Sequence, residues 1–193
     1  MTAITLELRP VINLTDEQFY QLCYNNPDIK LDRNAKGELI VMPPTGWGTG
    51  KRNTKLTQRL ANWTDEDGTG IAFDSSTGFK LPNGADRSPD AAWVRQERLD
   101  ALNPIPDPDK FLPLAPDFVV ELMSRNDSLE KTQAKMQEYR DNGVRLSWLI
   151  DPKNKQVEIY RQDRPKEVLQ FPATLSGEDV LPGFVLDLSQ ILV

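Results

Sequence analysis

The chain has 193 residues, of which 38% are hydrophobic and 27% are charged, and its formal net charge is −6. This length suits one domain spanning residues 1–193, and the composition is that of a globular chain rather than a disordered or fibrous one. The absence of histidine excludes a Ser-His-Asp triad, a Cys-His pair and histidine-ligated zinc. The negative charge argues against a protein that coats nucleic acid, but it is compatible with a nuclease whose carboxylates hold a metal ion.

Cysteine usage and the apolar segments indicate the cellular compartment. Cys23 is the only cysteine, which excludes an intrachain disulfide and fits a reducing compartment. The N-terminus has no basic region followed by a long apolar stretch, and no apolar run reaches the roughly 18 residues of a membrane span. We therefore expect a cytoplasmic protein that does not cross a membrane.

The first elements expected are a helix and a strand. Residues 14–24 predict a helix, because the segment opens with a capping box. Cys23 has helical spacing with Phe19, so we expect a core thiol rather than a reactive one. A turn-like segment at 34–37 then precedes a strand at 38–42, which ends at two prolines.

A second helix is expected from about residue 49 to residue 65. Apolar side chains recur on one stripe of this helix, whereas lysine and arginine side chains occupy its other faces. Asn53 is the one polar side chain on the apolar stripe, and it is either a satisfied structural amide or a group beside an active site. The stripe consists of Asn53, Leu56, Leu60 and Trp63.

Short β-like runs and a proline-rich segment follow. The runs at 70–73, 77–79 and 91–94 are separated by turn residues, and this pattern predicts an antiparallel meander. Residues 102–116 contain five prolines, too many for a regular element, so we expect a surface loop there. By analogy with other proteins of such folds, this loop is a candidate contact for a homodimer.

The second half of the chain alternates between strands and one long helix. The helix is expected to begin near residues 126–130 and to end at Gly143, which is a good C-cap residue. The apolar tail at 181–188 is expected to dock on the body of the protein. Together the elements predict an α/β (α+β) fold with a mixed central sheet flanked by helices. The strands expected in this half are 116–123, 146–150, 157–160 and 168–171.

One predicted strand contains an acidic residue in an otherwise apolar sequence. Glu121 interrupts the apolar run of 116–123, and an ionised carboxylate there costs several kcal/mol unless a cation or a proton compensates it. Asp90 stands at the edge of the preceding β-like run. Two acids on neighbouring strands make a site for a hard cation such as Mg²⁺ or Mn²⁺. Structural ion pairs would produce the same sequence pattern.

The helix after Glu121 offers two lysines that could complete such a site. At ~100° per residue, Leu129, Met136 and Tyr139 share one face of this helix. Lys135 lies at the border of that face, whereas Lys131 lies further toward solvent. We therefore predict that Lys135 acts on water or on a phosphate oxygen, in a site suited to metal-assisted hydrolysis of phosphodiesters.

Four segments of the chain form a recognisable set: SPDAAWV at 88–94, PDFVVELMS at 116–124, KMQEY at 135–139 and WLIDP at 148–152. These segments resemble the Uma-two family of restriction endonucleases. The resemblance extends from Leu14 to the Leu-Pro-Gly segment at 181–183. It implies the restriction-endonuclease-like fold of the PD-(D/E)XK nucleases, with Asp90 and Glu121 as metal ligands and Asp90, Glu121 and Lys135 as catalytic residues.

The chain departs from the family pattern at two positions. PD-(D/E)XK nucleases usually have the lysine two residues after the acid, and Met123 occupies that position here. In Uma-two-like proteins the lysine is found on the following helix, which agrees with Lys135. Relatives also carry a glutamate or histidine before the second helix, where this chain has Gly48.

Two functions are therefore expected from the sequence. The first is a Mg²⁺- or Mn²⁺-dependent endonuclease that hydrolyses phosphodiester bonds in DNA. The alternative is a catalytically inactive module that keeps the nuclease-like fold and binds protein or nucleic acid, which Gly48 and the net charge of −6 favour.

Overall fold

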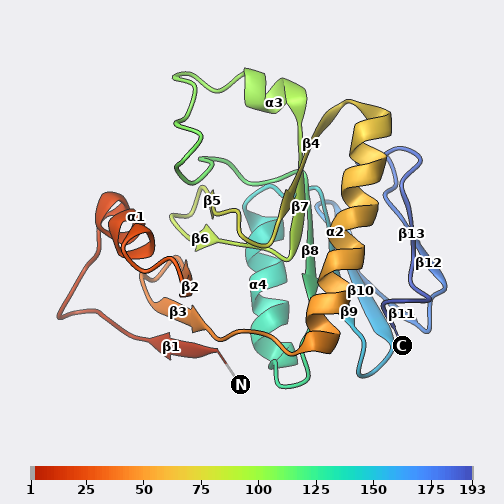
Figure 1. The fold of residues 1–193 in the computed structure, drawn as a ribbon, viewed down its shortest axis with the longest axis horizontal. Helices are drawn as coiled ribbons and strands as arrows, with labels where there is room; N and C mark the ends of the chain where they lie inside the picture. Colours follow the sequence, from red (N-terminus) through yellow and green to blue (C-terminus); the bar gives the residue numbers. More distant parts are fainter. Residues whose placement is uncertain (1–2, 193) are drawn as a thin grey trace.

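A six-stranded mixed sheet forms the centre of the computed structural model, which describes residues 3–192 (Figure 1). Its strand order is β11-β10-β9-β8-β7-β4. Strands β8 and β9 pair in parallel and the other neighbours pair antiparallel. The strands are β4 (Gly70–Asp74), β7 (Ala91–Arg95), β8 (Phe118–Leu122), β9 (Leu146–Asp151), β10 (Gln156–Arg161) and β11 (Arg164–Gln170).

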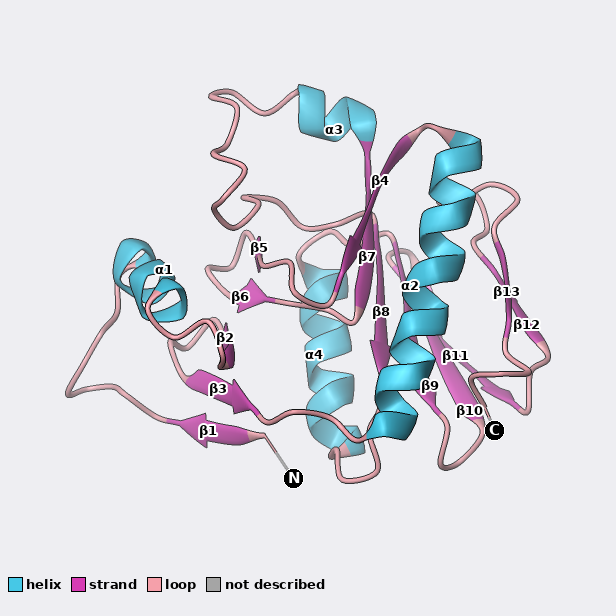
Figure 2. Ribbon diagram, viewed as in Figure 1, coloured by secondary structure: helices cyan, strands magenta, loops and turns pink. Residues whose placement is uncertain are grey.

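Helices cover both faces of this sheet. Parallel strands need a crossover connection, and α4 (Leu129–Asp141) provides it between β8 and β9. Leu56 and Leu60 of α2 (Trp47–Asp67) pack with Val120 on one face. Met136 and Tyr139 of α4 pack with Val119 on the opposite face. The sheet therefore lies between α2 and α4, as Figure 2 also shows, and the predicted mixed α/β fold is confirmed.

A second, smaller sheet of order β1-β3-β2-β6-β5 lies beside the central one. The predicted antiparallel meander is wrong, because β4 pairs directly with β7 in the central sheet. The segment between them leaves that sheet and forms β5 and β6 of the smaller one. The smaller sheet consists of β1 (Ile4–Leu6), β2 (Lys30–Arg33), β3 (Leu39–Met42), β5 (Phe79–Lys80) and β6 (Asp86–Arg87).

The helix ends confirm the local sequence signals. The first helix, α1 (Asp16–Tyr24), begins with the predicted capping box. The Thr15 hydroxyl accepts a hydrogen bond from the Gln18 N–H, and the Gln18 side chain accepts one from the Thr15 N–H. At the end of α4, Gly143 adopts a φ of +95°, a conformation that favours glycine.

The remaining segments surround this framework. The short helix α3 (Gln96–Asp100) precedes the proline-rich loop, which forms one isolated bridge from Leu112 to Phe79. Homodimer formation through this loop stays a prediction. The tail forms the hairpin β12 (Thr174–Ser176) and β13 (Val185–Asp187) and docks on the α2 face as expected, through Leu181, Phe184 and Leu186.

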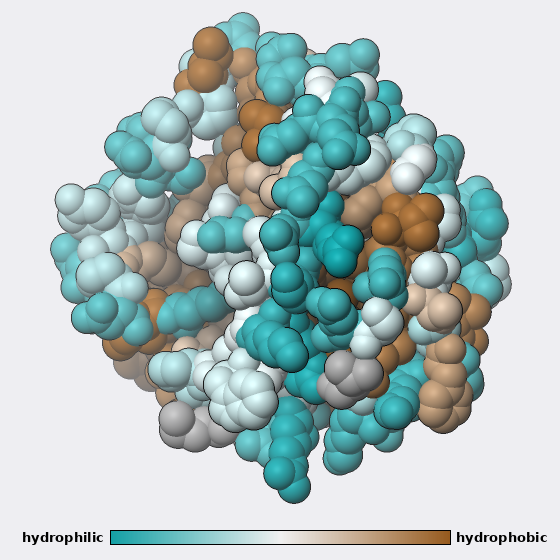
Figure 3. Space-filling view, turned by 45° about the vertical axis from the view of Figure 1, so that its right-hand side comes forward, coloured by the Kyte–Doolittle hydropathy of each residue, from teal (hydrophilic) through white to brown (hydrophobic). Residues whose placement is uncertain are grey.

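Figure 3 shows the hydropathy of the surface on one face of the molecule. Hydrophilic side chains dominate the face in Figure 3, and apolar groups are confined to patches among them. No helix among residues 3–192 is long and apolar enough to cross a membrane.

Candidate active site

Glu121 lies in β8, a central strand whose five residues are all buried. Its side chain points to the α4 face, since the neighbours Val120 and Leu122 pack on the α2 face. On the α4 side the Tyr139 hydroxyl donates a hydrogen bond of 2.9 Å to Glu121 Oε1. Lys135 Nζ lies 2.7 Å from the same oxygen. These two donors compensate the acid that the apolar strand contains.

Burial and neighbouring charges shift the pKa values of Glu121, Lys135 and Tyr139. Burial raises the pKa of Glu121, the Asp90 carboxylate adds to this effect, and the Lys135 ammonium opposes it. Burial lowers the pKa of Lys135, but the Glu121 and Asp32 carboxylates outweigh burial and raise it. Burial also raises the pKa of Tyr139 well above its ordinary value. Lys135 is therefore a cation, and Tyr139 a hydrogen-bond donor, at neutral pH.

Asp90 is placed beside Glu121 by the strand register. Ala91 of β7 pairs with Val120 of β8, so in an antiparallel pair Asp90 stands across from Glu121. Asp90 Oδ2 accepts a 2.7 Å hydrogen bond from the Leu122 N–H. The structure thus brings together the three residues that the sequence analysis selected, Asp90, Glu121 and Lys135.

Two further side chains belong to this cluster. Asn53 of α2 donates a hydrogen bond of 2.9 Å from Nδ2 to Asp90 Oδ1, so the amide that faces inward on the predicted stripe is located beside the acids. Asp32 of β2 is 1% exposed, and its Oδ2 lies 3.5 Å from Lys135 Nζ. Lys135 is therefore held between Glu121 and Asp32.

Sequence reasoning missed Asp32. The signal that could have found it is the turn at 34–37, because the strand predicted after this turn implies a pairing strand before it. The observed hairpin pairs Asp32 with Ile40. Asp32 Oδ1 accepts a 3.0 Å hydrogen bond from the Ser88 N–H, which connects the smaller sheet to the segment that carries Asp90.

Comparisons with known proteins identify the family and the fold of the chain. Residues 16–189 match the family model described as "Uma2: Putative restriction endonuclease". The chain belongs to the Uma2 family. A solved structure, described as "a putative nuclease belonging to DUF820 from Anabaena variabilis ATCC 29413", has 18% sequence identity and a TM-score of 0.72. That match covers 84% of this chain and 89% of the other, and it shows that the two share a fold. No curated protein matches the chain.

Lys131 and Arg87, two other basic residues of this Uma2 protein, differ in their surroundings. Lys131 is exposed on α4, as the helical-face argument predicts. Arg87 is buried between Glu138 and Asp32, with its Nη2 2.5 Å from Glu138 Oε2 and its Nη1 3.7 Å from Asp32 Oδ2. Met123 packs against the hydrophobic core beneath α4. The ammonium group that contacts Glu121 therefore comes from Lys135 and not from position 123.

Gly48 lies in the first turn of α2 and has no side chain that could contribute to the site. A Cβ built at Gly48 would meet Arg52 Nη1 at 3.5 Å, which is ordinary contact. The backbone therefore does not require glycine at this position, and the departure from the family pattern is a difference in side-chain chemistry.

The donor set of this Uma2 protein fits a divalent ion. Within residues 3–192, no three His, Cys, Asp or Glu side chains form a group that could hold a metal ion. Mg²⁺, however, is commonly bound through one or two carboxylates and keeps several waters. Asp90 and Glu121 provide two carboxylates, and the Oδ1 atom of Asn53 is buried without a hydrogen-bond partner. These oxygens are the donors that such an ion prefers.

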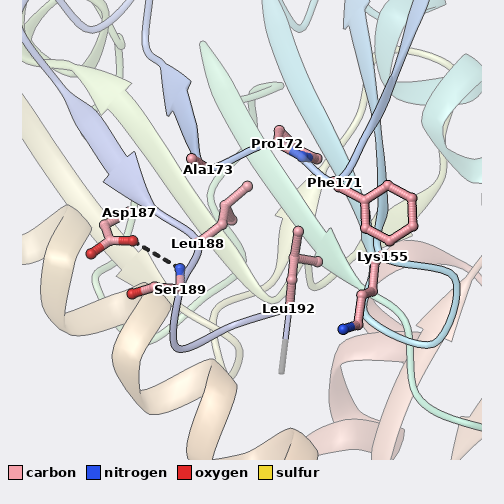
Figure 4. A pocket seen from close by; sticks show the side chains of 8 residues that line it. All are labelled: Lys155, Phe171, Pro172, Ala173, Asp187, Leu188, Ser189 and Leu192. Atoms are coloured by element: carbon pink, nitrogen blue, oxygen red, sulfur yellow. Dashed lines mark hydrogen bonds between the residues drawn. The ribbon is translucent and has the colours of Figure 1, made fainter.

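Two cavities outside the cluster show no comparable chemistry. One of about 300 Å³ lies at the tail, and Figure 4 shows that Phe171, Leu188 and Leu192 contribute to its walls. The acid on its rim, Asp187, already accepts a 2.8 Å hydrogen bond from the Ser189 N–H. The other, of about 260 Å³, lies between the β10–β11 turn and the segment at 178–180. Neither cavity contains a residue of the cluster.

Proposed function

We propose that this Uma2 protein is a Mg²⁺- or Mn²⁺-dependent endonuclease that hydrolyses phosphodiester bonds in DNA. The observation that carries the proposal is the joint placement of Asp90, Glu121 and Lys135, with Lys135 Nζ 2.7 Å from Glu121 Oε1. Family membership supports a nuclease, and the deep burial of Glu121 gives a physical reason for a cation beside it.

Each side chain has a distinct role in this proposal. Asp90 and Glu121 would hold the divalent ion, which when bound activates water and neutralises charge that develops on phosphate. Hydrolysis forms a bond between phosphorus and the water oxygen and breaks one phosphorus–oxygen ester bond, without a covalent link to the protein. Because its pKa is raised by Glu121 and Asp32 against burial, Lys135 is a proton donor in hydrogen bonds at neutral pH. It therefore orients water or a phosphate oxygen and does not act as a general base.

The experiment that tests this proposal is a cleavage assay on plasmid, linear and single-stranded DNA with Mg²⁺ or Mn²⁺. The wild-type protein is compared with Glu121→Gln and Lys135→Ala, and Glu130→Gln serves as a matched control because Glu130 is exposed on α4. We expect cleavage by the wild type and the control, and none by the two site variants. Equal cleavage by Glu121→Gln and the wild type would contradict the assignment of Glu121 to the endonuclease site.

A second candidate function is a non-catalytic module that binds protein or nucleic acid. Gly48 favours it, because this position supplies no side chain to the cluster. A calorimetric titration separates the two functions. Binding of Mn²⁺ that depends on Asp90 and Glu121 supports the endonuclease, whereas absence of Mn²⁺ and Mg²⁺ binding supports the module.

A further inference from the structure

Asn53 contains an acceptor that the protein itself leaves unused. Its Oδ1 atom is buried and has no hydrogen-bond partner among the described residues. The other two atoms in this condition are the indole Nε1 groups of Trp93 and Trp148, which are donors. Asn53 Oδ1 is therefore the single buried side-chain acceptor without a hydrogen-bond partner in the part of the chain that the structure describes. A buried acceptor without a partner is unfavourable, so a partner from outside the protein would stabilise Asn53 Oδ1.

The orientation of the amide follows from the chemistry of its neighbour. Asn53 Nδ2 donates a hydrogen bond of 2.9 Å to Asp90 Oδ1. An ionised carboxylate only accepts hydrogen bonds, so the opposite orientation would place two acceptors against each other. The hydrogen bond to Asp90 thus fixes the position of Oδ1 beside the carboxylate that receives it.

The ligand that suits this oxygen is a cation. Asp90 and Glu121 form no group of three metal-binding acids with any other described residue. Mg²⁺ and Mn²⁺ prefer hard oxygen ligands, and asparagine carbonyl oxygens serve hard cations in the same way as carboxylates. The Asn53 oxygen is neutral, so adding it as a ligand brings no further charge. The two negative charges of Asp90 and Glu121 then balance the two positive charges of one divalent ion.

We propose that Asn53 Oδ1 is the third protein ligand of the divalent ion, alongside Asp90 and Glu121. In this arrangement the Asn53 side chain has two functions, since Nδ2 orients Asp90 and Oδ1 binds the ion. The inference rests on the proposed function, because it requires that the two carboxylates bind the ion.

The test compares two substitutions that separate these functions. Asn53→Leu removes both the donor and the oxygen, whereas Asn53→Asp keeps an oxygen and removes the donor. Asn62→Asp is the matched control, because Asn62 is exposed on the same helix and gains the same charge. The readouts are the Mn²⁺ dissociation constant by calorimetry and the shift in melting temperature on addition of Mn²⁺.

We expect Asn53→Leu to weaken Mn²⁺ binding about 10- to 100-fold. Without metal, Asn53→Asp should melt below the wild type, because its carboxylate faces Asp90. Its Mn²⁺-induced rise in melting temperature should exceed that of the wild type, because a charged oxygen replaces the neutral one. Asn62→Asp should match the wild type in both readouts.

Three outcomes would overturn the inference. If Asn53→Leu binds Mn²⁺ as the wild type does, Asn53 is not a ligand. If Asn53→Asp loses Mn²⁺ affinity as much as Asn53→Leu, the amide acts only through its donor to Asp90. If the wild type binds no Mn²⁺, or if Glu121→Gln leaves its affinity unchanged, the proposed metal site fails and the inference fails with it. Should Asn53→Leu not fold, the Asn53→Asp comparison still decides between ligand and positioning residue.

Discussion

The Oδ2 atom of Asp32 lies 3.5 Å from Lys135 Nζ, although Asp32 belongs to β2 of the smaller sheet and Lys135 to helix α4, which covers the central sheet. Lys135 reaches Glu121 on its other side, at 2.7 Å. Asp32 is itself held by the Ser88 N–H at 3.0 Å, so its carboxylate is a fixed neighbour of the lysine. The smaller sheet therefore contributes directly to the geometry of the candidate active site.

Asp32→Asn should lower the rate of DNA cleavage about 10- to 100-fold, the range seen when groups that orient a metal-site residue are removed. The amide still accepts from Ser88, but it no longer offers a charge to Lys135. Mn²⁺ affinity should stay unchanged, because Asp32 acts on the lysine. The exposed Asp28→Asn is the control. A cleavage rate equal to that of the wild type would show that Asp32 has no role in positioning Lys135.

Gly70→Ala should destabilise the protein by about 1–3 kcal/mol, the usual cost of overpacking. A Cβ at Gly70 would lie well inside contact distance of the Trp93 ring and the Val94 carbonyl oxygen. Gly50→Ala is the matched control, because its Cβ meets nothing within 4 Å and the position is helical. The control should gain about 0.5–1 kcal/mol. Urea unfolding measures both, and equal midpoints for the two variants would refute the packing described at Gly70.

Glu158 should stabilise the protein in a pH-dependent manner. Burial raises its pKa, but hydrogen bonds from Tyr160, Lys166 and Gln133 outweigh burial and lower it. Since the folded-state pKa is depressed, the stabilisation is present above the unfolded-state pKa and is lost as the pH falls through the folded-state pKa.

The measurement for Glu158 is urea unfolding of Glu158→Gln at neutral and at acidic pH. At pH 7 the variant should be less stable than the wild type by about 1.5–3 kcal/mol, the range for hydrogen bonds to a charged group. The difference should shrink as the pH falls below the pKa of an ordinary glutamate. Glu130→Gln, at an exposed position, should show no such trend. A pH-independent difference would contradict the assigned ion pair and hydrogen bonds.

Cys23 should react slowly with alkylating reagents. The thiol is half-buried, and burial together with the Asp86 and Asp32 carboxylates raises its pKa to about 11. Because the thiolate is the nucleophile, little of it is present at pH 8. The rate of iodoacetamide modification at pH 8 should be well below that of free cysteine and should reach the free-cysteine rate in urea. Equal rates in folded and unfolded protein would exclude the buried position.

Most of the candidate site could be predicted from the sequence because its signals are local. Glu121 interrupts an apolar run within one strand, and Lys135 follows from the angular spacing of a single helix. Asp90 precedes a strand that carries its own apolar pattern. Each of these inferences needs only about ten neighbouring residues.

The remainder depended on contacts between distant segments. Asp32 lies in a four-residue strand of sequence KLDR, which has no alternating apolar pattern to identify it. The meander was wrong for a related reason, since β5 and β6 have two residues each and pair outside the central sheet. Short polar strands are specified by their partners in space, and a single sequence does not display those partners.

The central claim is that Glu121 forms part of a metal-dependent nuclease site, and one comparison tests it most directly. Conversion of supercoiled plasmid to nicked or linear DNA is measured with Mn²⁺ for the wild type and for Glu121→Gln, at equal protein concentration and after melting curves have shown that both are folded. We predict cleavage by the wild type and a rate at least about 100-fold lower for the variant, as expected for loss of a catalytic group. Cleavage by Glu121→Gln at the wild-type rate would contradict the claim.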